Sequence, residues 1–276
     1  MPIPLAVQNV PGRKSTAGHE LSFLAKDLKP LRHTQFCVEV QNNHKDKRNG
    51  NRGETTDILK SSNGKQFHFN NQSNRLVKLE KPFGASGNLK EIEFTQEYLY
   101  YTGYQTGSRT SGAYIFRPNE ESPTPLGDPT TSISFSGDLF HEIHQTFYDP
   151  MKNIHVSQVL RIPQENTSFL FDVEVEWMVG PIPIKDNQGK EFVHRIHVNG
   201  LENNGLYYTD SNGRQYMERR RNVRPDFEVP NAELLEPVAS NYYPITSNMF
   251  IEDDEKQLRV TLLTDRSQGG GSIRYI

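Results

Sequence analysis

The sequence predicts an all-β protein, a large antiparallel β-sandwich, on three observations. From residue 65 onward, apolar residues alternate with polar ones along one segment after another, which is the period of a half-buried strand. Short runs rich in glycine, proline and asparagine, which are turn formers, separate these segments. No long stretch has the 3.6-residue spacing of an amphipathic helix. Strands at short intervals with turns between them are typical of sandwiches.

The pattern divides the chain into two parts. Residues 1–64 are poorly patterned, and we expect two short strands there, Leu21–Leu24 and Thr34–Val40, followed by an exposed polar loop over residues 41–57. Residues 65–276 form the predicted β-sandwich domain.

The clearest predicted strand is FLFDVEVEWMV, at residues 169–179. Its apolar residues occupy every second position and therefore share one face, while acids occupy the other face. The strand is expected to have one buried and one wet side. The apolar face comprises Phe169, Phe171, Val173, Val175, Trp177 and Val179, and the polar face Asp172, Glu174 and Glu176.

A hairpin is predicted at YYTDSNGRQYMERRR, residues 207–221, because Asn212 and Gly213 adopt positive φ at little cost. A later strand, QLRVTLLT, is expected to point Leu258, Val260 and Leu262 inward. The second hairpin strand places four residues on one face: Gln215, Met217, Arg219 and Arg221.

The composition excludes some classes of function. The chain of 276 residues has a net charge of −3, whereas general nucleic-acid binders have a basic surplus, so we expect no nucleic-acid partner. No segment approaches the roughly 20 apolar residues of a membrane helix, so we expect no membrane partner. The single cysteine, Cys37, excludes an intrachain disulfide. The opening residues, MPIPLAVQNVPGRK, contain no apolar run of signal-peptide length.

No local motif identifies a reaction centre. His141 and His144 superficially suggest zinc, but on a strand their side chains point to opposite faces, and His194 and His197 have the same spacing. Ser267 has no recognisable base, and the glycines at 269–271 are not followed by the helix that a phosphate site needs. We therefore assign no catalytic residue, no metal ligand and no cofactor to this chain.

Arg219 is the side chain with two open interpretations. An arginine on the same face as Met217 is expected to be partly buried and to need a partner. Either it pairs structurally with an acid, or it faces a ligand cleft. The candidate acids are Glu218, Asp226 and Glu233.

Two N-x-S/T triplets, at Asn71 and Asn166, are possible N-glycosylation sites if the parent protein passes through the secretory pathway.

Five motifs occur in one order along the chain: SGAYIFRPN (111–119), VEWMVGPIPIKDNQGKEF (175–192), YYTDSNGRQYMERRRNVRP (207–225), EPVASNYYPITSNMFIEDDEKQL (236–258) and LLTDRSQGGGS (262–272). Together they resemble the C-terminal β region of the lysosomal-type α-mannosidases, glycoside hydrolase family 38. The resemblance extends from about Arg75 to Ser272. It implies a supersandwich-like, galactose-mutarotase-like fold, present here as a fragment truncated at both ends.

The resemblance also implies a chemistry that belongs elsewhere in the enzyme. Family members hydrolyse α-mannosides of glycoprotein N-glycans with retention, using an aspartate nucleophile and a zinc ion held by two histidines and two aspartates. These groups belong to an N-terminal catalytic domain, so zinc is expected there and not in this chain. The chain is expected to be inactive by itself, with the N-terminal catalytic and helical domains and mannose-containing glycans as its partners. The lysosome or secretory pathway is the expected location.

By the same resemblance, Tyr101 and Arg219 correspond to residues at the family's substrate cleft. Tyr100 and Arg220 are their rivals, since a shift of one position moves a side chain to the other face. Two alternatives to the scaffold of an α-mannosidase stay open: a free-standing carbohydrate-binding β-sandwich without hydrolase activity, and a purely structural β protein.

Overall fold

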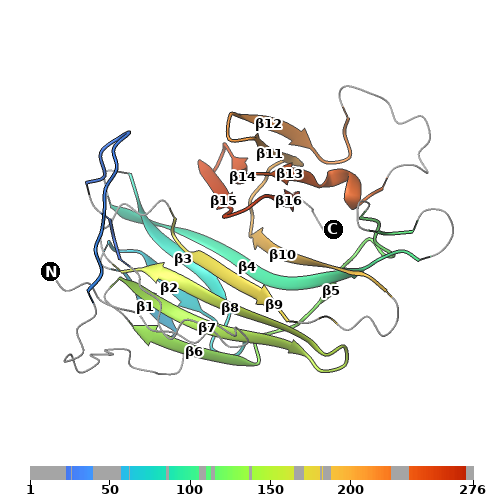
Figure 1. Ribbon diagram of the computed structural model, residues 1–276, viewed down its shortest axis with the longest axis horizontal. Helices are drawn as coiled ribbons and strands as arrows, with labels where there is room; N and C mark the ends of the chain where they lie inside the picture. The colour runs from blue at the N-terminus through green and yellow to red at the C-terminus, as the bar shows by residue number, and fades with distance from the viewer. Residues whose placement is uncertain are drawn as a thin grey trace. The chain divides into compact units, whose positions relative to one another are not determined.

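The computed structural model describes residues 23–25, 27–39, 57–61, 63–84, 87–105, 110–112, 116–136, 139–164, 171–180, 182, 188–224 and 236–271. The chain forms two compact units. Unit 1 comprises Met1–Glu97 and Leu126–Pro183, and unit 2 comprises Tyr98–Pro125 and Ile184–Ile276. Strand β4 (Asn88–Thr102), the long strand in Figure 1, contributes residues to both units.

Unit 1 is built from two antiparallel sheets. The first has the order β1-β2-β3-β4, and the second has the order β6-β7-β8-β9 (Figure 1). The other strands of this unit are β1 (Ile58–Lys60), β2 (Gln66–Phe69), β3 (Leu76–Phe83), β6 (Thr131–Ser136), β7 (Phe140–Asp149), β8 (Ile154–Pro163) and β9 (Glu174–Val179).

The core of unit 1 lies between these two sheets. Phe67 and Phe69 of β2 pack in one cluster with Ile143 of β7 and with Leu160 and Ile162 of β8. All five side chains are nearly inaccessible to solvent. The predicted all-β sandwich is therefore confirmed, and no α-helix occurs in the described ranges.

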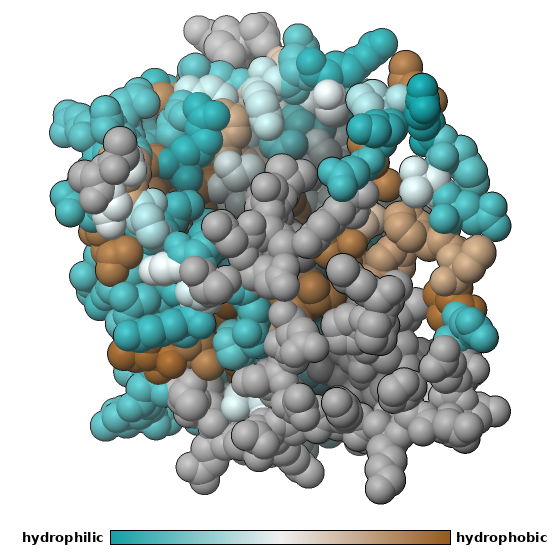
Figure 2. All heavy atoms as spheres, turned by 90° about the vertical axis from the view of Figure 1, so that its left-hand side faces the viewer, coloured by the Kyte–Doolittle hydropathy of each residue, from teal (hydrophilic) through white to brown (hydrophobic). Residues whose placement is uncertain are grey.

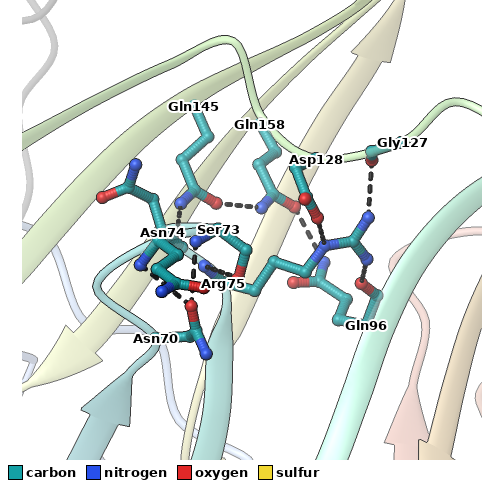
Figure 3. A network of polar contacts seen from close by, with 10 residues as sticks. Asn70, Ser73, Asn74, Arg75, Gln96, Gly127, Asp128, Gln145 and Gln158 are labelled. Carbon is teal, nitrogen blue, oxygen red and sulfur yellow. Dashed lines mark hydrogen bonds and ion pairs between the residues drawn. The ribbon is translucent and has the colours of Figure 1, made fainter.

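A polar network also crosses between the sheets of unit 1 (Figure 3). Gln96 of β4 donates to Gln158 of β8 at 2.8 Å, and Gln158 donates to Gln145 of β7 at 2.6 Å. Gln145 in turn donates to the carbonyl oxygen of Asn74. Arg75 donates to Asp128 at 2.6 Å and to the carbonyl oxygens of Gln96 and Gly127. These bonds give buried amides hydrogen-bond partners and join the two sheets of unit 1.

Unit 2 contains a four-stranded antiparallel sheet with the order β12-β11-β14-β15. Strands β13 and β16 pair separately, and the end of β4 pairs with β5 and β10. Tyr207, Ile245 and Met249 form a buried cluster in this unit. Its other elements are β5 (Thr124–Pro125), β10 (Lys190–Val198), β11 (Leu206–Ser211), β12 (Gln215–Arg220), the 3₁₀ turn η3 (Ala239–Asn241), β13 (Tyr243–Ile245), β14 (Asn248–Asp253), β15 (Leu258–Leu263) and β16 (Gln268–Gly270).

The predicted hairpin is confirmed, because β11 and β12 pair directly through a turn in which Asn212 and Gly213 have φ of 54° and 65°. Strand β15 alternates as expected at Leu258 and Val260, whereas Leu262 is 37% exposed. This strand is at the edge of its sheet, so its last residues have a neighbour on one side only.

The two strands predicted near the N-terminus are not formed in the described residues. Residues 23–25 and 34–39 have no strand structure, although Phe23 and Phe36 pack against each other at a ring distance of 5.0 Å. Apolar alternation indicates a strand only where a neighbouring strand can pair with its backbone. The predicted polar loop at 41–57 lies outside the described residues except for Asp57. The boundary at residues 64/65 stays a prediction.

One face of the molecule is seen in the space-filling view of Figure 2. In the view of Figure 2, hydrophilic side chains cover most of the coloured surface, and apolar residues form small patches. The described part of the chain contains no helix long and apolar enough to cross a membrane.

Candidate functional site

The sequence-predicted Arg219 lies in a cluster of unit 2 that we call the Arg219–Tyr243 cluster: Tyr207, Thr209, Arg219, Arg224 and Tyr243. Strand pairing builds it, because Tyr207 of β11 lies opposite Arg219 of β12, and paired residues share a face of the sheet. This face packs against β13, which supplies Tyr243. Arg219 is half-buried there, as alternation predicts.

The Arg219 guanidinium is fixed by two contacts. Its central carbon lies 3.9 Å from the centroid of the Tyr243 ring, a cation–π arrangement. Its Nε donates to the Thr209 hydroxyl at 3.2 Å, and Thr209 is fully buried. Within the described residues, no hydrogen bond uses the two terminal nitrogens of Arg219. The arrangement presents a held cation with unused N–H donors, which suits hydroxyl or carboxylate oxygens.

Arg220, the alternative to Arg219, has a different environment. Arg220 is exposed on the opposite face of β12, where it reaches the carbonyl oxygen of Asn204 at 3.4 Å. Of the three candidate acids, Glu218 is exposed on that opposite face as well, and Asp226 and Glu233 lie outside the described residues.

Tyr207 is a fully buried member of the cluster. Its hydroxyl donates to the carbonyl oxygen of Asn241 at 2.7 Å. Burial raises the pKa of Tyr207 well above its usual range, so the hydroxyl stays protonated and keeps donating. Sequence reasoning missed the roles of Thr209 and Tyr243, because the pairing of β11 with β12 and the packing of β13 against them bring these residues to Arg219. Arg224, which follows β12, also lies over the Tyr243 ring, at 5.8 Å from its centroid.

Tyr101, the other predicted cleft residue, is 2% exposed and packs edge-on against Phe116 at a ring distance of 5.5 Å. Phe116 in turn contacts the ring of Tyr242 at 5.9 Å. Tyr101 is thus linked through Phe116 to Tyr242, the neighbour of Tyr243 in the chain. Its rival Tyr100 is equally buried, against Phe192. A place for Tyr101 beside a sugar stays a prediction.

The first histidine pair is separated as predicted. His141 and His144 occupy opposite faces of β7, and His144 lies 3.2 Å from Glu142. His194 stacks on Tyr98 at 5.0 Å, and burial lowers the pKa of His194 to about 4. No group of three or more histidine, cysteine or acidic side chains suited to a metal ion occurs in the described part of the chain.

The glycine run at 269–271 has a packing role that the sequence did not reveal. Gln268–Gly270 forms β16, which pairs with β13. In this pairing Gly270 lies opposite Tyr243 of the Arg219–Tyr243 cluster. A Cβ atom on Gly270 would meet the Met249 sulfur at 2.7 Å, and one on Gly271 would meet the Asn241 carbonyl oxygen at 2.5 Å. At Gly270 a Cβ atom would meet side chains, whereas at Gly271 the close approach of two backbones requires glycine.

Asp210 joins the hairpin to the turn between β13 and β14. Its Oδ1 accepts from the backbone N–H groups of Thr246 at 2.7 Å and Ser247 at 3.1 Å, and its Oδ2 accepts from that of Gly213 at 2.8 Å. The Thr246 hydroxyl also donates to Oδ2. Hydrogen bonds from the Thr246 hydroxyl and from these backbone groups outweigh desolvation and hold the pKa of Asp210 well below its usual range.

The hydrogen bonds to the Asp210 carboxylate predict that unit 2 loses stability in acid. A depressed folded-state pKa means that the stabilisation is complete above the unfolded pKa of about 3.9 and is lost as pH falls toward the folded value. We expect Asp210→Asn to lower the Tm at pH 7 by roughly 5 °C, because an amide cannot accept on both sides, and to reduce the loss of stability below about pH 4. Thermal unfolding between pH 7 and pH 2 measures the Tm of each variant, with the exposed Asp254→Asn as control. If Asp210→Asn loses as much Tm below about pH 4 as the parent protein does, Asp210 is not the group that makes unit 2 acid-sensitive.

The predicted sequon at Asn71 lies on an exposed turn between β2 and β3, and Asn166 lies outside the described residues.

The packed antiparallel sheets define this chain as a β-sandwich protein. The family model described as "Glycosyl hydrolases family 38 C-terminal domain" matches residues 66–274, and the chain therefore belongs to this family.

The chain is similar to known α-mannosidases. It is 43% identical over 183 residues to the lysosomal alpha-mannosidase of Bos taurus, covering 65% of this chain and 17% of that protein. It is 42% identical over 183 residues to the lysosomal alpha-mannosidase of Homo sapiens, covering 65% of this chain and 16% of that protein. It is 35% identical over 189 residues to the alpha-mannosidase of Canavalia ensiformis, covering 67% and 18%. The chain thus spans less than a fifth of the length of these relatives.

Proposed function

We propose that this chain is a supporting β portion of an α-mannosidase of the lysosome or secretory pathway, and that Arg219 forms part of the wall of its sugar cleft. Family membership and the names of the relatives support the enzyme class. One observation carries the role of Arg219: its guanidinium is fixed by Tyr243 and Thr209 while its terminal N–H groups are unused within the described residues.

The proposal leaves bond cleavage to the rest of the enzyme. The donor groups of the described residues do not fit a zinc ion, because no three of their histidine, cysteine or acidic side chains are grouped to hold one. Retaining, zinc-dependent hydrolysis of the α-mannosides of N-glycans belongs, in this proposal, to the catalytic part. By itself the chain is expected to give no turnover of a chromogenic α-mannoside with zinc at acid pH.

Arg219 would act by binding and orientation. A guanidinium that is already stacked loses little conformational entropy when it binds a hydroxyl, so the contact favours the bound sugar more than a mobile exposed arginine would. Charge-assisted hydrogen bonds of this kind contribute about 1.5–3 kcal/mol each.

The test places the chain in a working enzyme. Its matching segment replaces that of the bovine relative, and kcat/KM for an α-mannoside is compared between Arg219→Ala and Arg220→Ala. We expect Arg219→Ala to lower kcat/KM by roughly 10- to 100-fold and the exposed Arg220→Ala to change it little. Equal effects of the two variants would contradict the role of Arg219.

A second measurement covers the case in which the chimaera does not assemble. Titration of this chain with α-mannosides, followed by NMR of the arginine side chains, reports direct contact. Selective shifts of Arg219 that vanish in Arg219→Ala support a sugar-facing arginine. Saturable binding by the isolated chain, together with a chimaera that is indifferent to Arg219→Ala, would favour a free-standing carbohydrate-binding module instead.

A further inference from the structure

The loop that joins β2 to β3, residues 70–75, contains three asparagines with different surroundings. The Asn70 side chain accepts from the backbone N–H groups of Gln72 and Ser73, each at 2.9 Å. Asn74 has a φ of 55°, and its carbonyl oxygen accepts from Gln145 of the polar network. Both residues therefore shape the loop and attach it to unit 1 (Figure 3).

Asn71 has no such role. It is exposed at the tip of this loop, and within the described residues no hydrogen bond or ion pair involves its amide. Two residues later, Ser73 completes the Asn-x-Ser triplet. Its Oγ lies 3.5 Å from the backbone nitrogen of Arg75, at the limit of hydrogen bonding.

We propose that Asn71 is an N-glycosylation site of this protein when the chain is made in the secretory pathway. The co-substrate is an oligosaccharide linked through a diphosphate to a lipid. The Asn71 amide nitrogen forms a bond to C1 of the first sugar, the bond from C1 to the phosphate oxygen breaks, and the lipid diphosphate leaves with the electron pair. The amide nitrogen loses one proton to a base of the transferring enzyme.

The fold tolerates this modification at Asn71. The glycan extends from an exposed side chain that makes no structural hydrogen bond in the described part of the chain, so no internal contact must be given up. The backbone around it is held by Asn70, by the pairing of β2 with β3, and by Arg75, whose guanidinium makes three hydrogen bonds.

The experiment expresses the full chain in a secreting eukaryotic cell, with Asn166→Gln and with an added C-terminal tail that carries one sequon. A glycan on the tail shows that the chain was exposed to the glycosylation enzymes. We expect two glycans by intact mass, one glycan in Asn71→Gln or Ser73→Ala, and two in Ser73→Thr, which preserves the triplet. Peptide-N-glycosidase should convert Asn71 to aspartate in the matching peptide.

Two outcomes would overturn the proposal. One is a modified tail beside an unmodified Asn71 peptide, and the other is equal glycan numbers in the parent and in Asn71→Gln. Because Ser73→Ala leaves the asparagine in place, and Ser73→Thr restores the hydroxyl, their comparison separates loss of the sequon from loss of folding. The fluorescence of Trp177, the single tryptophan, confirms that unit 1 is folded in each variant.

Discussion

Replacement of Arg161 by methionine is expected to destabilise unit 1 by about 3–5 kcal/mol, the largest effect of any substitution considered for this chain. The Arg161 side chain is 8% exposed, and its Nε donates to Glu142 at 3.1 Å. Glu142 is 7% exposed and also lies 3.2 Å from His144. Methionine fills much of the same volume but leaves the Glu142 carboxylate buried without its guanidinium partner.

The outer partners of Arg161 contribute less. Glu176 lies 3.0 Å away and Glu174 3.6 Å away, but their side chains are 34% and 46% exposed. Water screens such pairs, and exposed pairs contribute about 0–1 kcal/mol. Glu174→Gln should therefore change the free energy of unfolding little, and it serves as the matched control.

Urea unfolding followed by Trp177 fluorescence measures the effect, because Trp177 lies on β9 beside this cluster. The double variant Arg161→Met with Glu142→Gln should recover a large part of the loss, since no charge is then left buried. If Arg161→Met is as stable as the parent protein, the pair does not stabilise unit 1. If the losses of unfolding free energy from Arg161→Met and Glu142→Gln simply add in the double variant, the two side chains are not coupled as their distance indicates.

Gly271→Ala is expected to destabilise unit 2 by about 1–3 kcal/mol. The added methyl group would lie 2.5 Å from the carbonyl oxygen of Asn241, which is backbone and 1% exposed. That oxygen also accepts the Tyr207 hydroxyl at 2.7 Å, so a shift that relieves the clash disturbs the base of the Arg219–Tyr243 cluster. No side-chain rotation can remove a clash with backbone.

The matched control is Gly189→Ala, at which a Cβ atom has nothing within 4 Å. Hydrogen exchange of peptides from β13 and β16 should become faster in Gly271→Ala and stay unchanged in Gly189→Ala. If both variants exchange like the parent protein, the two backbones are farther apart than the structure has them, and the packing role of the glycine run is wrong.

Local sequence pattern indicated the strand character of the chain from residue 65 onward and the faces of several of its residues. Alternation placed Val173 and Val175 inward, separated His141 from His144, and distinguished half-buried Arg219 from exposed Arg220. The Asn212-Gly213 pair fixed the hairpin because both residues accept positive φ. Motif order also sufficed to indicate the family, which the match to residues 66–274 confirmed.

Tertiary structure decided which residues pack against those faces. Tyr243 beneath Arg219, the buried position of Tyr101, the Gln145–Gln158 network and the clash that excludes a side chain at Gly271 all join residues distant in sequence. The absence of the N-terminal strands from the described residues has the same origin, since alternation does not supply a pairing partner. The period of a strand is a local property of its backbone, whereas packing partners depend on how separate strands assemble, and one sequence read in order contains only the first.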